Sequence, residues 1–294
     1  MRVNKTRDMA TILDGKTLAS EIRGDLAIKV SELKEKHGRA PHLAVILVGE
    51  DPASTVYVRN KAIACEKAGI RNTTVNMPAD TPEAELLSVI DSLNKADDVD
   101  GILVQLPLPS HISEDKVIEA IDKEKDVDGF HPLNVAGLWQ KTPHTEPCTP
   151  MGIMMLLESY GIDPKGKRAV VVGRSKIVGL PVAKMLLDRN ATVTICHTRT
   201  VNLADEIRRA EILVAAAGKP RVITGDMIAP GAVVIDVGIN RDPETGKMCG
   251  DVDFDTAAQK ASAITPVPGG VGPMTIACLL LNTVRCFRHR FGEL

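Results

Sequence analysis

The sequence predicts an α/β protein of two domains, and three observations lead to this prediction. Apolar, strand-like runs alternate with helix-like segments in the first half of the chain, and the alternation starts again in the second half. Between the two series, around residues 140–150, the chain is polar and rich in proline, as at a domain boundary. The length of 294 residues also suits two domains of ordinary size.

The first series runs strand, helix, strand, helix, strand, helix. The strands are expected at 43–48, 73–77 and 101–106, and the helices at 53–68, 83–95 and 114–121. The runs LAVILVG and GILVQLP do not alternate between apolar and polar residues. This pattern is typical of parallel strands that helices cover on both faces, so we predict a parallel sheet here.

The second series begins at Thr149-Pro150, a helix N-cap followed by a first-turn proline. Its strands are expected at 169–172, 192–196, 212–216 and 232–237, with helices from about 178 and at 202–210. The segment TPVPGGVGPMT then leads into an amphipathic helix from Met274 to about Arg288. The predicted domains are therefore 10–148, with 274–294 packing back on it, and 149–273.

The composition excludes several function classes. No stretch approaches the roughly 20 apolar residues that span a bilayer, and the amino terminus has no apolar signal core, so we expect a cytoplasmic protein. A net charge of −2, with one Trp, two Tyr and four Phe, argues against binding nucleic acid. The six cysteines are scattered without a C-x-x-C pair, so we expect small buried hydrophobes rather than disulfide partners or zinc ligands.

A glycine turn marks the second series. The strand AVVVG leads into Gly173, Arg174 and Ser175, and a helix starts near Gly179, giving the spacing G-x-S-x-x-x-G. Such a turn directs backbone N–H groups and the positive end of a helix towards an anion, so it can hold a phosphate. The alternative is a tight turn between strand and helix that binds no ligand.

The end of the next strand bears on the choice of nucleotide. An NAD-binding unit places a carboxylate there for the ribose 2′-hydroxyl, whereas this chain has His197, Thr198 and Arg199. With Arg174 in the glycine turn, this edge suits a 2′-phosphate, because a guanidinium binds phosphate bidentately. We therefore expect NADP rather than NAD as the cofactor. The alternative for Arg199 is a solvated surface residue.

Polar residues of the first series could carry proton chemistry. Tyr57 and Lys61 lie four residues apart on one face of a predicted helix, and a lysine desolvated beside a phenol is a usable acid or base. Gln105 ends a predicted strand at the edge where α/β sheets bind ligands, and Asp126 and Asp128 follow in KDVDGF. A carboxylate there can accept the paired N–H donors of an amino-pyrimidine. For each residue the alternative is an ordinary surface or turn position.

Seven motifs lie in order along nearly the whole chain: YVRNK (57–61), VQLPLP (104–109), KDVDG (125–129), PCTP (147–150), GRSKIVG (173–179), DVGIN (236–240) and TPVPGGVGPMT (265–275). In this combination the chain resembles the bifunctional methylenetetrahydrofolate dehydrogenase/methenyltetrahydrofolate cyclohydrolase family. The resemblance implies a folate-binding catalytic domain and a Rossmann-like NADP-binding domain with a folate pocket in the cleft between them, no metal, and a homodimer. It also implies oxidation of 5,10-methylenetetrahydrofolate with NADP, then hydrolysis of the 5,10-methenyl product to 10-formyltetrahydrofolate, in one-carbon metabolism.

The same resemblance implies roles for individual residues. Lys61 is the central acid/base, Gln105 holds it in its neutral form, Tyr57 lines or stacks on the folate, and Asp128 anchors the pterin. The other residues implied are Pro268, Gly269 and Gly272 beside the folate cleft, and Gly173, Arg174, Ser175, Thr198 and the backbone of Ile239 at NADP. Thr198 stands where many relatives carry serine, and the residues before ATILDGK look like an added start.

Overall fold

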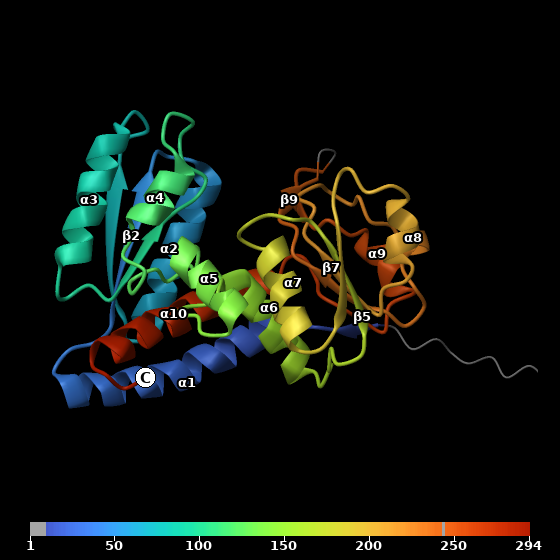
Figure 1. Cartoon of the computed structure of the whole chain (residues 1–294), viewed down its shortest axis with the longest axis horizontal. Helices are drawn as coiled ribbons and strands as arrows, with labels where there is room; N and C mark the ends of the chain where they lie inside the picture. The colour runs from blue at the N-terminus through green and yellow to red at the C-terminus, as the bar shows by residue number, and fades with distance from the viewer. Residues whose placement is uncertain (1–9, 243–244) are drawn as a thin grey trace, which may run out of the picture. The chain divides into compact units, whose positions relative to one another are not determined.

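The computed structural model of the protein describes residues 10–242 and 245–294 (Figure 1). The chain divides into two compact units. The three-stranded unit comprises Ala19–Met151 and Thr275–Leu294, and the six-stranded unit comprises the described residues up to Leu18 together with Gly152–Met274. Each unit has its own parallel sheet, so the prediction of two α/β domains is confirmed. The added start predicted before ATILDGK lies outside the described residues.

The three-stranded unit is built on β2 (His42–Val48), β3 (Arg71–Met77) and β4 (Gly101–Val104), in the order β3-β2-β4. Both pairings of β2 are parallel. All residues of β2 and β4 are buried, as their unbroken apolar runs predict. The helices whose residues lie mainly in this unit are α1 (Gly15–His37), α2 (Pro52–Lys67), α3 (Glu83–Lys95), α4 (Glu114–Ala120), α5 (Pro132–Gln140) and α10 (Val271–Arg290).

Helix α1 is long, and the alternation of strands and helices does not predict it. Its buried residues Ala19, Leu26, Val30 and Leu33 share one face, because they follow one another at intervals of three, four and seven. The signal for this helix is therefore an apolar stripe on an otherwise polar segment that precedes the first buried strand.

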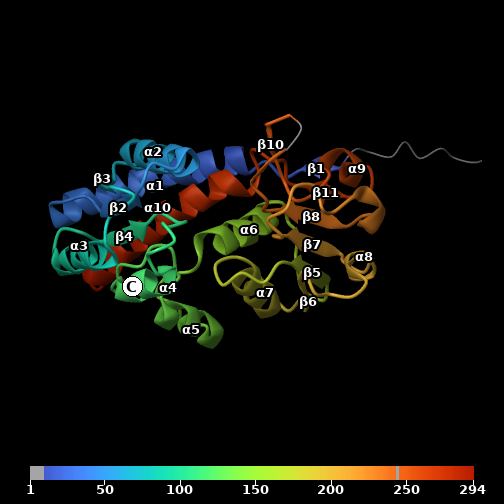
Figure 2. The same ribbon diagram turned by 90° about the horizontal axis from the view of Figure 1, so that it is seen from above.

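The six-stranded unit has a fully parallel main sheet in the order β1-β11-β8-β7-β5-β6, which can be followed in Figure 2. Its strands are β1 (Thr11–Ile12), β11 (Ala263–Ile264), β8 (Val233–Asp236), β7 (Ile212–Ala215), β5 (Arg168–Val172) and β6 (Thr192–Cys196). Its helices are α6 (Cys148–Ser159), which starts in the other unit, α7 (Gly179–Asp188), α8 (Leu203–Ile207), α9 (Phe254–Ala258) and the 3₁₀ turn Gly225–Met227. A short antiparallel pair, β9 (Asn240–Arg241) and β10 (Met248–Cys249), follows β8.

Strand β1 differs from the sequence-based expectation, which places the chain from residue 10 onwards in the first domain. Thr11 pairs with Ala263 in the sheet of the six-stranded unit. The Thr11 N–H donates to Ser262 O at 2.8 Å, and the Leu13 N–H donates to Ile264 O at 2.9 Å. A strand of two residues carries no periodic pattern, so only these long-range hydrogen bonds reveal where it belongs.

All six cysteines lie in the described part of the chain and are buried, which confirms the expectation that they pack as small hydrophobes. Burial raises the pKa of Cys65 and of Cys278 to about 12. In the part of the chain that the structure describes, no helix combines the length and apolar character needed to cross a membrane.

Candidate active site

Lys61 and Gln105 meet in the three-stranded unit. Helix α2 starts at Pro52 after Asp51, whose side chain accepts a hydrogen bond from the Ser54 N–H at 2.7 Å, and it carries Lys61 inward so that only 9% of the residue is exposed. The Lys61 Nζ donates to Gln105 Oε1 at 2.9 Å. The fold therefore brings together two of the predicted site residues, Lys61 from α2 and Gln105 from the end of β4.

The backbone around Gln105 determines which side of its amide faces the lysine. The Gln105 N–H donates to Ile46 O at 2.9 Å, which extends the pairing of β4 with β2 by one residue. The Gln105 Nε2 group donates to Leu106 O at 2.6 Å. Since the amide nitrogen is used there, the amide oxygen is the atom that faces Lys61 Nζ.

The charge of Lys61 is disfavoured by burial, which lowers the pKa of the side chain, and the Asp128 carboxylate opposes this by favouring the ammonium. The resemblance implies that Gln105 holds Lys61 neutral. An oxygen acceptor, however, stabilises an ammonium at least as well as an amine, so the lowered pKa comes from burial and not from Gln105.

Asp128 is the acidic neighbour of Lys61. Burial raises the pKa of its carboxyl to about 6, although the Lys61 charge acts in the opposite direction. Asp126, by contrast, is used by the turn itself, because its carboxylate accepts from Gly129 N at 3.0 Å, His131 N at 2.8 Å and Asn134 Nδ2 at 2.8 Å. Of the two aspartates in KDVDGF, Asp128 is therefore the one available to a ligand.

Tyr57 lies one helical turn before Lys61 on α2 and is partly buried, and this burial raises the pKa of its phenol. Cys148 is near enough to Asp128 and Lys61 for the charges of both to act on its thiol. Its Sγ donates to Val127 O at 3.2 Å, and Asn282 Nδ2 of α10 donates to the same carbonyl at 2.8 Å. These two contacts hold the backbone just before Asp128, and the sequence patterns assigned no site role to Cys148 or Asn282.

The glycine turn of the six-stranded unit is compact. Gly173 follows β5 with φ of 133°, and a Cβ atom there would lie 2.0 Å from Ala216 O. A Cβ at Gly179 would lie 2.3 Å from Gly173 O. Glycine is therefore required at both ends of G-x-S-x-x-x-G because the backbone approaches so closely.

The hydrogen bonds of this turn differ in one respect from the expected phosphate cradle. Ser175 Oγ accepts from the N–H groups of Val178 and Gly179, each at 3.2 Å, so two amides at the start of α7 already have a partner. Arg174 and Ser175 themselves are exposed. An anion at this turn would therefore be held mainly by these two residues rather than by the helix amides.

Thr198 and Arg199 are exposed directly after β6, which pairs with β5 in parallel, so they lie at the same sheet edge as Arg174. The Gly173 N–H donates to Cys196 O at 2.9 Å and ties the two strand ends together. Ile239, half exposed after β8, lies near Gly272, where an added Cβ would meet Ile239 Cδ1 at 3.9 Å. Pro268 is exposed and Gly269 is partly exposed, so this loop also presents residues to solvent.

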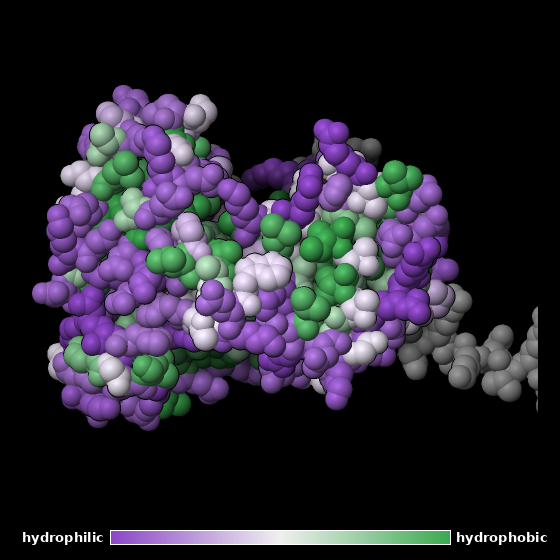
Figure 3. All heavy atoms as spheres, viewed as in Figure 1, coloured by the Kyte–Doolittle hydropathy of each residue, from purple (hydrophilic) through white to green (hydrophobic). Residues whose placement is uncertain are grey.

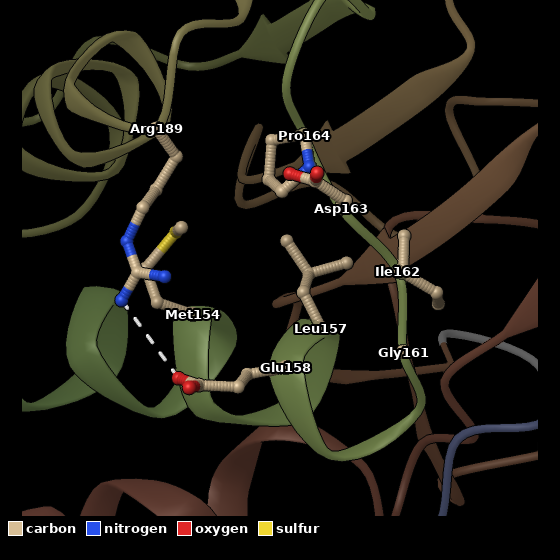
Figure 4. Close-up of a pocket in the computed structure, with 8 residues that line it drawn as sticks. All are labelled: Met154, Leu157, Glu158, Gly161, Ile162, Asp163, Pro164 and Arg189. Carbon is tan, nitrogen blue, oxygen red and sulfur yellow. Dashed lines mark ion pairs between the residues drawn. The ribbon is translucent and has the colours of Figure 1, made fainter.

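A separate cavity of about 340 Å³ lies in the six-stranded unit (Figure 4). Met154 and Leu157 of α6 form its apolar side, while Arg189 reaches from the end of α7 to Glu158, at 3.7 Å between Nη2 and Oε2. Its loop residues precede β5 and Arg189 precedes β6, so it opens at the amino ends of the strands. Cofactors of such sheets bind at the carboxyl ends, which excludes this cavity as the nucleotide site.

Two buried aspartates, Asp236 and Asp251, were missed by the sequence patterns although DVGIN contains the first. They are 4% and 0% exposed, and both carboxylates accept backbone N–H groups. The available signal was an aspartate within two residues of a glycine, in DVG and again in GDV. Such a signal is weak, because it does not show which loops the carboxylates join.

Comparison with known proteins identifies the family. The model of the tetrahydrofolate dehydrogenase/cyclohydrolase catalytic domain matches residues 13–128, and that of the NAD(P)-binding domain of the same family matches residues 147–291. The bifunctional protein FolD of Moorella thermoacetica is 64% identical over 280 residues, which cover 95% of this chain and 99% of the relative.

Solved structures that resemble this chain belong to the same family. The FolD methylenetetrahydrofolate dehydrogenase/cyclohydrolase of Campylobacter jejuni is 50% identical with a TM-score of 0.92, covering 96% of this chain and 99% of its own. The FolD of Trypanosoma brucei, solved with NADP cofactor and an inhibitor, is 41% identical with a TM-score of 0.92, covering 96% of this chain and 98% of its own. The chain belongs to the tetrahydrofolate dehydrogenase/cyclohydrolase family.

Proposed function

We propose that the chain performs two consecutive reactions on a folate. It oxidises 5,10-methylenetetrahydrofolate to 5,10-methenyltetrahydrofolate with NADP, and it hydrolyses that product to 10-formyltetrahydrofolate. The observation that carries this proposal is the buried Lys61, with a lowered pKa, hydrogen-bonded to Gln105 and next to Asp128. Family membership and the glycine turn after β5 agree with it.

The residues of the three-stranded unit bind the folate and move its protons. Asp128 accepts N–H donors of the pterin as a carboxylate, which it is above a pKa of about 6. Tyr57 lines the ring on the same helix face as Lys61. In the hydrolysis, the Lys61 amine takes a proton from the attacking water at Nζ and returns one to the folate nitrogen as the C–N bond breaks. The second proton of the water is released, which balances the charge of the methenyl cation.

The residues of the six-stranded unit fit NADP. Arg174 and Thr198 are exposed at adjoining strand ends, and residues 197–200, which directly follow β6, include no carboxylate that would repel a 2′-phosphate. Gly173, Ser175 and the backbone of Ile239 complete the site, and Pro268, Gly269 and Gly272 border the folate. NADP, when bound, supplies a hydride acceptor at its nicotinamide ring.

Absorbance after mixing the purified protein with 5,10-methylenetetrahydrofolate and NADP, and then with NAD, tests both reactions, provided NADPH and the methenyl species are followed separately. We expect NADP-dependent reduction with little methenyl accumulation. In Lys61→Met we expect hydrolysis to be lost while the protein remains folded, because an apolar chain cannot carry a proton.

The matched control is Lys67→Met, which changes an exposed lysine in the last turn of the same helix and is expected to behave as the wild type. Hydrolysis that survives in Lys61→Met would contradict the role of this lysine. Accumulation of the methenyl species by the wild type would mean that the chain is a dehydrogenase alone.

We further propose that the protein is a homodimer joined through the face formed by β6 and α7. Strand β6 is an edge strand of the six-stranded sheet, so among the described strands it pairs with β5 alone. Exposed apolar residues cluster along this stretch of chain, and Figure 3 shows apolar atoms gathered on the face that carries α7. These residues are Leu180, Leu187, Ile195 and Val201.

Sedimentation of the wild type at micromolar concentration is expected to give twice the chain mass. Leu187→Glu and Ile195→Glu together should give the chain mass, because they bury charge at the interface. The control is Leu133→Glu on α5, which is 59% exposed and lies in the other unit. A monomeric wild type would contradict the proposal. The six buried cysteine thiols also agree with a reducing compartment, and we propose the cytoplasm, which cell fractionation tests.

A further inference from the structure

Asp251 gathers two loops at the carboxyl edge of the six-stranded sheet. Its Oδ2 accepts from Ala217 N at 2.6 Å and from Gly218 N at 2.9 Å, and its Oδ1 accepts from Lys219 N at 3.0 Å. These amides follow β7. The Oδ1 atom also accepts from Asn240 Nδ2 at 2.8 Å, and Asn240 is the first residue of β9, directly after the loop that follows β8. One fully buried carboxylate therefore receives four N–H donors from both loops.

Asp236 holds Asp251 in place. This aspartate ends β8, and its Oδ1 accepts from Asp251 N at 2.9 Å, while its Oδ2 accepts from Val252 N at 2.9 Å. A Cβ at Gly250 would lie 1.8 Å from Asp236 Oδ2, so the two segments are in direct contact. The position of the Asp251 side chain is thus determined by the end of a strand and not by a free loop.

Ile239, proposed to contact NADP through its backbone, lies between two neighbours that both touch Asp251. A Cβ at Gly238 would lie 2.3 Å from Asp251 Oδ1, and Asn240 donates to the same atom. On the other side, Ala216 precedes the first amide bound to Asp251, and the Gly173 turn packs against its carbonyl. Asp251 therefore links the segment that carries Ile239 to the segment that packs against the Gly173 turn.

The strand order shows which end of the cofactor this arrangement serves. Strand β6, with Thr198 and Arg199, lies on one side of β5, whereas β7 and β8 lie on the other. A dinucleotide that crosses the carboxyl edge, with its 2′-phosphate at β6 and its diphosphate at the Gly173 turn, places its nicotinamide over β7 and β8.

We propose that Asp251 is a positioning residue for the nicotinamide end of NADP, acting through the Ala217–Lys219 amides and Ile239. The inference rests on the proposed NADP site. The carboxylate does not touch the cofactor in this account. It keeps the two loops at the spacing that the nicotinamide and its ribose require.

Asp251→Asn tests the proposal with little change in volume. Each oxygen of Asp251 faces two donors, so whichever way the asparagine amide turns, its NH₂ group meets two N–H groups and cannot bond either. We expect the Kd for NADP, measured by calorimetry, and the KM for NADP to rise at least about ten-fold. Hydrolysis of 5,10-methenyltetrahydrofolate without NADP should stay within about two-fold of wild type, because it does not use this site.

The matched control is Asp253→Asn, which changes an aspartate two residues further on, at the start of α9, whose side chain forms no cap hydrogen bond. It should bind NADP as the wild type does. An unchanged Kd in folded Asp251→Asn would overturn the proposal, and so would a parallel loss of hydrolysis and NADP binding, which would indicate a purely structural role. Failure of the wild type to bind NADP would instead overturn the proposed function.

Asn240→Ala covers the case in which Asp251→Asn does not fold. This substitution removes one of the four donors at a partly exposed position, next to Ile239. We expect the Kd for NADP to rise about three-fold with hydrolysis unchanged. A Kd equal to that of the wild type would overturn the proposal.

Discussion

Replacing Gln105 by methionine distinguishes two opposite accounts of Lys61. If Gln105 holds Lys61 neutral, as the family resemblance implies, then removing it should make the lysine easier to protonate. In the structure the amide oxygen accepts from Lys61 Nζ at 2.9 Å, and Nε2 is used by Leu106 O. An oxygen acceptor favours the ammonium, so its removal should make the lysine harder to protonate.

The size of the effect follows from the kind of hydrogen bond. A hydrogen bond to a charged group contributes about 1.5–3 kcal/mol, and one between neutral groups about 0.5–1.5 kcal/mol. Loss of the acceptor therefore costs the ammonium about 1–1.5 kcal/mol more than the amine, since the thioether of methionine is a weak acceptor. That difference moves the acid limb of the pH profile down by about one pH unit.

The assay is kcat/KM for hydrolysis of 5,10-methenyltetrahydrofolate against pH. Gln105→Glu is the companion variant, because a carboxylate in place of the amide should move the acid limb in the opposite direction. If activity is too low, the ¹³Cε chemical shift of Lys61, assigned with Lys61→Met, follows the same titration. Movement to higher pH in Gln105→Met would refute the argument from the amide orientation.

Three further predictions concern single contacts. Arg174→Ala should raise the KM for NADP roughly ten- to hundred-fold and leave the KM for NAD nearly unchanged, because only the contact with the 2′-phosphate is lost. Equal changes in the two KM values would show that Arg174 does not bind the 2′-phosphate. Gly173→Ala should lower the free energy of unfolding in urea by about 2–4 kcal/mol, because its φ is 133° and its Cβ would lie 2.0 Å from Ala216 O, whereas Gly24→Ala in α1, with nothing within 4 Å, should not destabilise. Glu293 accepts from Lys36, His37 and Arg288, which lowers the pKa of its carboxyl from 4.5 to about 2. Glu293→Gln should therefore reduce Tm above pH 4.5, and the difference should shrink as the pH falls towards 2; a difference independent of pH would contradict the ion pairs.

Much of the fold could be predicted because its strands are buried on both faces. Runs such as LAVILVG contain no polar residue, and β2 is indeed buried throughout. Strand β1, with two residues, carries no pattern and depends on hydrogen bonds to residues about 250 positions away. Helix α1 had a pattern, but its apolar stripe is thin among charged residues.

From the sequence, only those site residues could be predicted whose type and position in a predicted helix or strand indicate their chemistry. Lys61 and Gln105 were found because a lysine one helical turn after a tyrosine and a glutamine at a strand end have local signatures. The orientation of the Gln105 amide depends on the carbonyl of Leu106 and has no counterpart in the sequence. Asp251 is hidden for the same reason, since three of its four donors are backbone amides, which every residue type except proline can supply.

Burial of Lys61 serves both proposed reactions for one electrostatic reason. Hydride removal leaves a cation on the folate, and an ammonium about 5 Å away would oppose it by about 3 kcal/mol at an effective dielectric constant of about 20. Such a penalty slows the step by about two orders of magnitude. An amine at the same place imposes no penalty and can then accept a proton from water in the hydrolysis. Desolvation, the largest influence on the pKa of Lys61, therefore favours the one protonation state that both steps require.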